Sequence, residues 1–198
     1  MKTNKLYRPL AIAYCIVTGA LTLLAIAAAI ADYPTMEDKV PMYLAPWGGA
    51  WGVTDKSLFY AMRMPVMAMC LQGMLLGLCP KRVDGWPEGI YSPMRMLVAG
   101  LSLITVTQLT LNPVMTIRQY SAVPRGILLC ALTLLGLALS IKGYLDINRC
   151  LKPMRTAEKT TFSLLIDFLW QACSSRRVLM IASVTAFMVL LVIPSLSL

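Results

Sequence analysis

The sequence predicts an all-α, polytopic membrane helical bundle of about five transmembrane helices, with a cytoplasmic interfacial helix before the last one. Of its 198 residues, 58% are hydrophobic and only 14% are charged, whereas about 25% are charged in an ordinary soluble protein. Apolar runs long enough to cross a bilayer alternate with short charged stretches, as in polytopic membrane proteins. We therefore exclude a soluble globular domain and treat residues 1–198 as a single integral membrane domain.

The predicted spans cover residues 10–31, 57–79, 96–117, 126–141 and 178–198. The first contains no charge, and at about 1.5 Å per residue it covers about 33 Å, enough for the hydrocarbon core. The second contains Arg63, and we expect this side chain to extend to the near interface. The fourth is short, but the cations that flank it, Arg125 and Lys142, can reach outward to make up the length.

The distribution of basic residues predicts the orientation of the chain in the membrane. Of the 18 Lys and Arg residues, 13 lie on the side that holds the N-terminus. The other five are Lys39, Lys56, Arg63, Arg118 and Arg125. Because basic segments are retained in the cytoplasm, the N-terminus is predicted to lie inside and the C-terminus outside. The net charge of +9 is then an orientation signal that also attracts anionic lipids, and we do not predict nucleic-acid binding.

The first apolar run has a second interpretation, as a cleaved signal peptide. Lys2, Lys5 and Arg8 precede it, and it ends in Ala29-Ile30-Ala31, which resembles a signal-peptidase site. A signal peptide has an apolar region of about 7 to 15 residues, so the length of this run favours a retained span. Cleavage would leave four spans.

The predicted external loop, residues 32–56, is rich in Pro, Gly and aromatic residues. Pro restricts the backbone and Gly permits tight turns, so we expect a compact cap on the helix ends. Its aromatic residues have two interpretations. They form an interfacial aromatic belt, or they form a recognition surface held on a rigid scaffold. In the second case Tyr43, Trp47 and Trp51 are the candidate contacts.

The predicted cytoplasmic segment, residues 142–177, is too long for a simple connection. Apolar residues at helical spacing within it predict a short amphipathic helix: Phe162, Leu165, Ile166, Leu169 and Cys173. Leu164, Phe168 and Trp170 widen its apolar face. The helix either lies on the inner leaflet or packs beneath the bundle.

Small and polar residues within the spans predict how the helices pack. Gly73 and Gly77 form a GxxxG pattern that permits close approach of another helix. Gln72 and Gln108 need hydrogen-bond partners on other helices. The pair Asn112-Pro113 predicts a kink or break near the outer end of the third span, because proline lacks a backbone donor and disfavours a helical predecessor.

No pattern of residues predicts catalysis, a metal or a cofactor. The absence of histidine excludes His-dependent zinc hydrolases and Ser-His or Cys-His nucleophiles. The six cysteines include no CxxC pair, and we interpret them as packing residues. The 14 methionines could ligate copper through soft thioethers, although flexible apolar packing explains them better. We therefore predict a protein that is not an enzyme.

The external loop resembles the signature of the SdpI-type bacterial immunity proteins. In that family a run of the form P-x-H-F-N-x-x-G, then Gly and Lys, joins the first two helices. The run here is Pro41-Met42-Tyr43-Leu44-Ala45-Pro46-Trp47-Gly48, followed by Gly52 and Lys56. Tyr43 replaces the usual His and Ala45 replaces the usual Asn. The resemblance covers about 30 residues, from Glu37 through Pro65.

This resemblance implies a bacterial cytoplasmic-membrane protein that protects the producing cell from a secreted peptide toxin and signals its presence. We predict a non-enzymatic role in sensing or neutralising an extracellular peptide or envelope stress. The resemblance assigns Pro41, Gly48, Gly52 and Lys56 to the architecture of the loop. The expected partners are the lipid bilayer and either an extracellular peptide or another membrane protein. The alternative function is a small transporter or an accessory subunit of a larger membrane complex, suggested by Asn112-Pro113 and the polar residues nearby.

Overall fold

The computed structural model describes residues 7–45, 50–78, 85–118, 122–155, 160–172 and 177–192. Its main elements, in chain order, are α1 (Tyr7–Asp32), β1 (Lys39–Leu44), β2 (Ala50–Asp55), α2 (Leu58–Gly77), α3 (Tyr91–Val106), the π-helical turn η3 (Thr107–Leu111), α4 (Asn112–Ile117), α5 (Ala122–Leu151), α6 (Thr161–Ala172) and α7 (Arg177–Val192). Short 3-10 turns are η1 (Tyr33–Thr35), η2 (Glu88–Ile90) and η4 (Lys152–Met154). The predicted helical class is confirmed for these residues, whereas the β-hairpin was not predicted.

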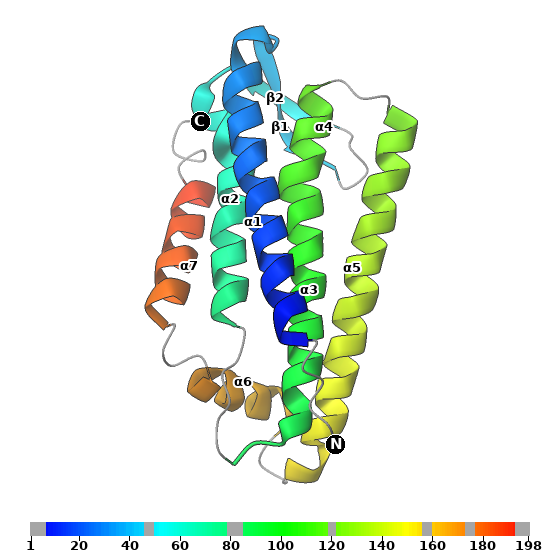
Figure 1. The fold of residues 1–198 in the computed structure, drawn as a ribbon. Helices are drawn as coiled ribbons and strands as arrows, with labels where there is room; N and C mark the ends of the chain where they lie inside the picture. Colours follow the sequence, from blue (N-terminus) through cyan, green and yellow to red (C-terminus); the bar gives the residue numbers. More distant parts are fainter. Residues whose placement is uncertain are drawn as a thin grey trace.

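The helices form a bundle with a different attachment at each end. α1, α2, α5, α7 and the rod formed by α3, η3 and α4 lie along one another (Figure 1). The hairpin β1–β2 lies at one end, and α6 lies crosswise at the other (Figure 1). α1 begins at the α6 end and extends to the hairpin, whereas α5 runs in the opposite direction.

Within the described residues, three helices are long and apolar enough to cross a membrane: Ile16–Thr35, Glu88–Thr116 and Val123–Met154. Met180–Val189 is a shorter apolar helix. The predicted fourth span covers residues 126–141. The helix at this place, α5, is longer: it has 30 residues and continues through Lys142 to Leu151. A charge ends an apolar run without ending a helix, and residues 142–151 therefore belong to α5 instead of an interfacial segment.

Large apolar side chains on the outside and polar groups between the helices distinguish this chain from a soluble protein. Large apolar side chains are exposed on the outer faces of three helices: Ile16, Leu23 and Leu24 of α1, Val123, Ile127, Leu134 and Ile141 of α5, and Val178, Ile181 and Met188 of α7. Hydroxyl and amide groups are buried between helices: Thr18, Thr22, Ser102, Thr107, Thr110, Asn112 and Ser140. Exposed apolar area on this scale suits contact with lipid.

α3 and α5 pack so closely that three glycines have no room for a side chain. A Cβ added to Gly100 would lie 2.5 Å from the carbonyl oxygen of Gly136, and one added to Gly136 would lie 2.9 Å from that of Gly100. A Cβ on Gly143 would lie 2.9 Å from the carbonyl oxygen of Pro93. The nearby hydroxyl of Ser140 donates to the Gly136 carbonyl at 2.8 Å. Backbone therefore packs on backbone, which fixes the antiparallel register of α3 and α5.

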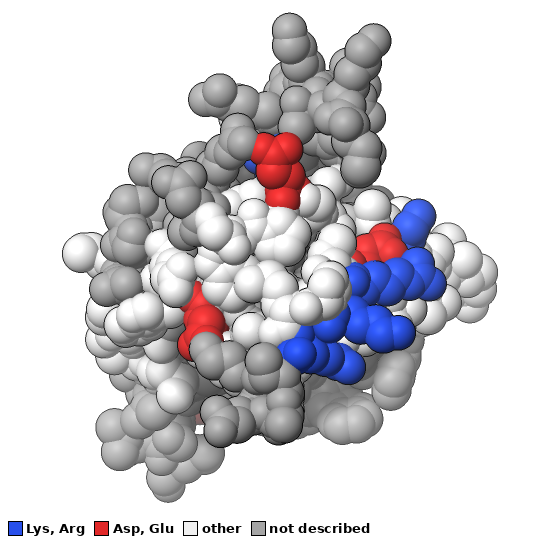
Figure 2. Space-filling view, turned by 90° about the horizontal axis from the view of Figure 1, so that it is seen from below, with Lys and Arg blue, Asp and Glu red and all other residues white. Residues whose placement is uncertain are grey.

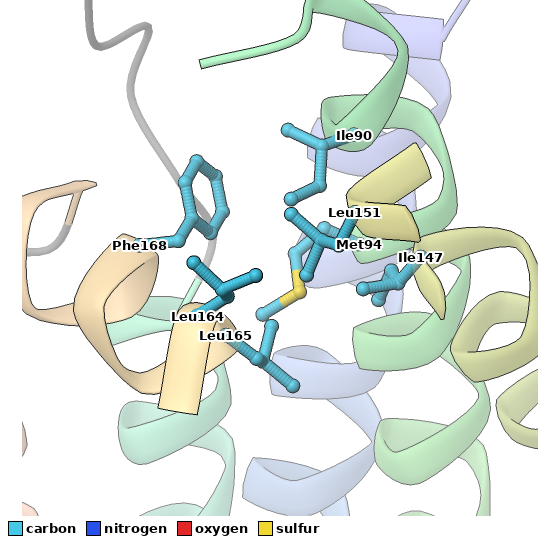
Figure 3. Packing of buried hydrophobic residues seen from close by; sticks show 7 residues of the cluster. All are labelled: Ile90, Met94, Ile147, Leu151, Leu164, Leu165 and Phe168. Carbon is cyan, nitrogen blue, oxygen red and sulfur yellow. The ribbon is translucent and has the colours of Figure 1, made fainter. Parts of the chain in front are cut away.

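α6 packs on the ends of α3 and α5 through an apolar cluster (Figure 3). The cluster consists of Ile90, Met94, Ile147, Leu151, Leu164, Leu165 and Phe168. The ring of Phe168 makes edge contacts with Trp86 at 5.1 Å and Tyr91 at 5.6 Å between ring centroids. The indole Nε1 of Trp86 donates to Gln171 Oε1 at 2.9 Å. One face of α6 therefore packs against the bundle.

We predict that Gly100→Ala destabilises the protein by about 1–3 kcal/mol, because the added carbon overlaps backbone that cannot rotate away. The measurement is equilibrium unfolding in mixed micelles with increasing sodium dodecyl sulfate, followed by circular dichroism. The control is Gly19→Ala, since a Cβ at Gly19 meets nothing within 4 Å. The control should be neutral or slightly more stable, as alanine favours helix. Equal losses in both variants would contradict the close contact as the cause.

Candidate functional site

The predicted external loop contains an antiparallel β-hairpin. Tyr43 pairs with Trp51, Pro41 pairs with Val53, and Lys39 pairs with Asp55. The side chains of Lys39 and Asp55 also form an ion pair at the open end. Gly52 has a φ of 69°, in the left-handed region that glycine adopts at low cost. This is a physical reason for glycine at position 52 of the hairpin.

Lys56 holds the two ends of the external segment together. Its Nζ donates to the carbonyl oxygens of Met36 at 2.9 Å and Pro34 at 3.3 Å, and lies 5.1 Å from the ring centroid of Tyr33. Its backbone N–H donates to the carbonyl of Asp38 at 2.8 Å. Lys56 therefore ties the start and the end of the external segment together through carbonyl groups of that segment.

A buried hydrogen bond fastens the hairpin to the helices. Asn112 Nδ2 donates to the carbonyl oxygen of Ala45 at 2.9 Å, and both residues are buried. The same amide donates to Gln108 Oε1 at 3.3 Å. Gln108 Nε2 donates to Thr133 Oγ1 of α5 at 2.7 Å, and that hydroxyl donates to the Leu129 carbonyl at 2.7 Å. We call Ala45, Asn112, Gln108 and Thr133 the polar chain.

The π-helical turn η3 lies in the middle of the polar chain. The backbone N–H of Asn112 donates to the carbonyl of Thr107, five residues earlier, and Pro113, which has no N–H, follows. The helix then resumes as α4, so the irregularity predicted at Asn112-Pro113 takes the form of a π turn. The buried hydroxyls of Thr107 and Thr110 have no hydrogen-bond partner among the described residues. Single π turns are frequent at functional sites.

Two further contacts complete the packing that was expected from the sequence. Gln72 and Ser102 bond across α2 and α3, with the Ser102 hydroxyl donating to Gln72 Oε1 at 2.5 Å. A Cβ on Gly73 would lie 2.5 Å from Ser183 Oγ of α7, so this glycine faces a helix of the same chain. Gly77 is the last residue of α2.

Arg63 does not extend to the interface as expected. Only 8% of the residue is exposed, and its Nε has no hydrogen-bond partner among the described residues. The reason is packing: α2 lies among α1, α3 and α7, which leaves a side chain near its first turns enclosed.

The structure brings some of the predicted site residues together. Tyr43 and Trp51 are opposite each other in the hairpin, whereas Trp47 and Gly48 lie outside the described residues. The sequence did not identify Ala45 or Thr133 as partners, since a polar residue in an apolar run shows that it needs a partner without showing which one. No group of three or more His, Cys, Asp or Glu that could hold a metal ion occurs within the described part of the chain.

Comparison with known proteins gives no relative: no family model, curated protein or solved structure matches this chain.

We predict that Asn112→Leu loosens the hairpin, because it removes the donor to the buried Ala45 carbonyl and leaves that acceptor unsatisfied at a cost of about 1–2 kcal/mol. A cysteine at Ala45, in a protein with its native cysteines replaced by serine, should then react roughly 5 to 30 times faster with a water-soluble maleimide.

The matched control is Gln72→Leu, which removes a half-buried amide with no bond to the hairpin. Its labelling rate at position 45 should equal that of the parent. Equal rates for Asn112→Leu and the parent would show that the hydrogen bond does not hold the hairpin.

Proposed function

We propose that this protein is a non-enzymatic receptor in a bacterial cytoplasmic membrane that senses or neutralises a peptide outside the cell. The observation that supports the proposal best is the buried bond from Asn112 to the Ala45 carbonyl. This bond couples an element outside the helices to the π turn of a candidate span. A peptide that moved the hairpin would therefore act directly on the interior of the bundle.

The proposal includes five membrane crossings, with the N-terminus inside and the C-terminus outside. α2, with 20 residues, packs along α1 and α3, and α7, with 16, packs along α2. The hairpin and α6 lie at opposite ends (Figure 1). The excess of basic residues on the α6 side supports placing that end in the cytoplasm.

The hairpin offers a specific way to bind a peptide. Its sheet has two strands among the described residues, so each strand has one edge with unpaired backbone groups. An extended peptide can add a strand to such an edge, with main-chain hydrogen bonds giving affinity. Tyr43 and Trp51, which pair across the hairpin, are aromatic residues of the kind that dominate binding energy at interfaces. The likeness to SdpI-type immunity proteins, which covers this same segment, supports the proposal.

The test is protection of bacterial cells against a panel of purified membrane-active peptides. Cells that express the protein should tolerate roughly tenfold more of at least one peptide than cells with an empty vector, equivalent to about 1.4 kcal/mol of binding. The double variant Tyr43→Ala/Trp51→Ala should lose this protection, because it removes the aromatic contacts. Tyr144→Ala, an exposed aromatic residue on α5, is the matched control and should keep it.

Protein levels in the membrane must be equal in all strains. Full protection by the double variant would contradict the contact assignment. Equal sensitivity of vector and parent cells to every peptide would count against immunity, and peptide-dependent labelling of Ala45→Cys would then decide whether sensing remains.

A second candidate function is a small transporter or an accessory subunit of one. The supporting observation is the pair of buried hydroxyls at Thr107 and Thr110 without partners among the described residues, since irregular backbone and free polar groups line many transport pathways. Solute uptake by proteoliposomes, abolished by Thr107→Val/Thr110→Val, would favour this function over a receptor. Equal uptake by parent and variant would exclude a role for these hydroxyls.

A further inference from the structure

α6 presents three faces of different character. Leu164, Leu165 and Phe168 pack on the bundle (Figure 3). Ser163, Asp167 and Gln171 form a polar face. Phe162, Ile166 and Trp170 form a third face, and they are 66%, 49% and 65% exposed. Because residues four apart are neighbours on a helix surface, these three side chains make one continuous apolar stripe, which we call the outer stripe.

The level of α6 along the bundle places the outer stripe near a bilayer surface. The uncharged part of α5 ends at Lys142, and the adjacent Gly143 lies against Pro93 and Leu97 of α3. Arg95 of α3 is therefore level with Lys142. Cations at one level on two neighbouring helices mark the edge of the hydrocarbon, with their side chains extending toward the headgroups.

α6 lies just beyond this edge. It packs on Ile147 and Leu151 of α5, which are about 8 and 13 Å beyond Lys142 at 1.5 Å per residue. The headgroup layer on each side of a bilayer is about 5–8 Å thick, and a helix with side chains is about 10–12 Å across. A helix lying crosswise at this level overlaps the headgroup layer, and its near side lies about 2–8 Å from the acyl boundary.

The charges near α6 match an anionic surface. Lys142, Arg149, Lys152 and Arg155 are exposed on the last turns of α5 and the following turn. Figure 2 shows that basic side chains gather on one side of this end of the molecule. Arg155 donates to Asn148 Oδ1 at 2.7 Å and to the Thr161 hydroxyl, which ties the start of α6 to α5. The helix is thus held in place beside a basic patch.

We propose that α6 is a bilayer-binding helix whose outer stripe inserts at the acyl boundary while the basic patch binds headgroups of anionic phospholipids. The buried face fixes its position, the polar face meets water, and the outer stripe meets lipid, as in interfacial amphipathic helices. The inference does not depend on the proposed receptor function, because a transporter with this fold would use α6 in the same way.

The experiment is electron paramagnetic resonance of the full chain in lipid nanodiscs, with its native cysteines replaced by serine. A spin label is placed in turn at Phe162→Cys, Ile166→Cys and Trp170→Cys, with Ser163→Cys and Asp167→Cys as controls on the polar face. Relaxation by oxygen, which concentrates in lipid, is compared with relaxation by a water-soluble nickel complex. Variants with an unchanged unfolding midpoint are compared.

The expected result is high oxygen and low nickel accessibility on the outer stripe and the reverse at the two controls. High nickel accessibility on the stripe would overturn the proposal by showing contact with water. Low accessibility to both reagents would also overturn it, because the stripe would then be covered by protein, and dipolar broadening between labels would identify a second copy.

Binding of anionic headgroups by the basic patch is tested by comparing nanodiscs of phosphatidylcholine alone with nanodiscs that also contain phosphatidylglycerol. We expect the anionic lipid to raise the oxygen-to-nickel ratio at Ile166→Cys roughly threefold, since each surface cation is attracted to anionic lipid. Lys142→Gln/Lys152→Gln should abolish that increase and leave the ratio in phosphatidylcholine unchanged. An equal increase in the variant and the parent would overturn the role of the basic patch.

Discussion

The contact between α3 and α5 is the constraint on which both ends of the molecule depend. Because Gly100 and Gly136 bring the two backbones together, the helices have one antiparallel register. That register places Gln108 beside Thr133 near the hairpin. At the opposite end it forms the apolar platform of α3 and α5 on which α6 packs. A larger side chain at either glycine would thus disturb two surfaces that are far apart.

The second organising principle is that polar groups in lipid must find partners within the protein. Gln108 and Asn112 satisfy each other and reach Thr133 and Ala45. Satisfying these amides therefore connects the hairpin to two helices without any charged residue. Among the described residues, the buried hydroxyls of Thr107 and Thr110 and the Nε of Arg63 have no such partner. Unsatisfied groups inside a π turn are a source of free energy for rearrangement, because a change of helical pattern can give them partners.

Hydropathy and charge predicted the helical class and the approximate positions of the long apolar helices, since each of these properties depends on local sequence. They also predicted that Gln72 and Gln108 would need partners on other helices. The same reasoning ended one span at Lys142, although α5 continues to Leu151, because charge reports the edge of the hydrocarbon instead of the end of a helix.

Other features could not be predicted, because they depend on which elements meet. Gly100 and Gly136 become important only in the register of two separate helices, and their spacing in the chain carries no GxxxG signal. The bond from Asn112 joins it to Ala45, 67 positions away in the chain. The hairpin was missed because Pro and Gly dominated the loop composition. Burial of Arg63 depends on three neighbouring helices, none of which its local sequence reveals.

The rod formed by α3, η3 and α4 touches both attachments, with Met94 packed against α6 at one end and Asn112 bonded to Ala45 of the hairpin segment at the other. Its lower part cannot slide along α5, because Gly100 leaves no space between the backbones. A movement of the hairpin must therefore be absorbed above that contact. η3 is the segment best placed to absorb it, since its π turn interrupts the regular helical hydrogen-bond pattern between that contact and Asn112. A peptide bound at the hairpin would then change η3 and the side chain of Gln108 while α6 and its lipid contacts stay in place.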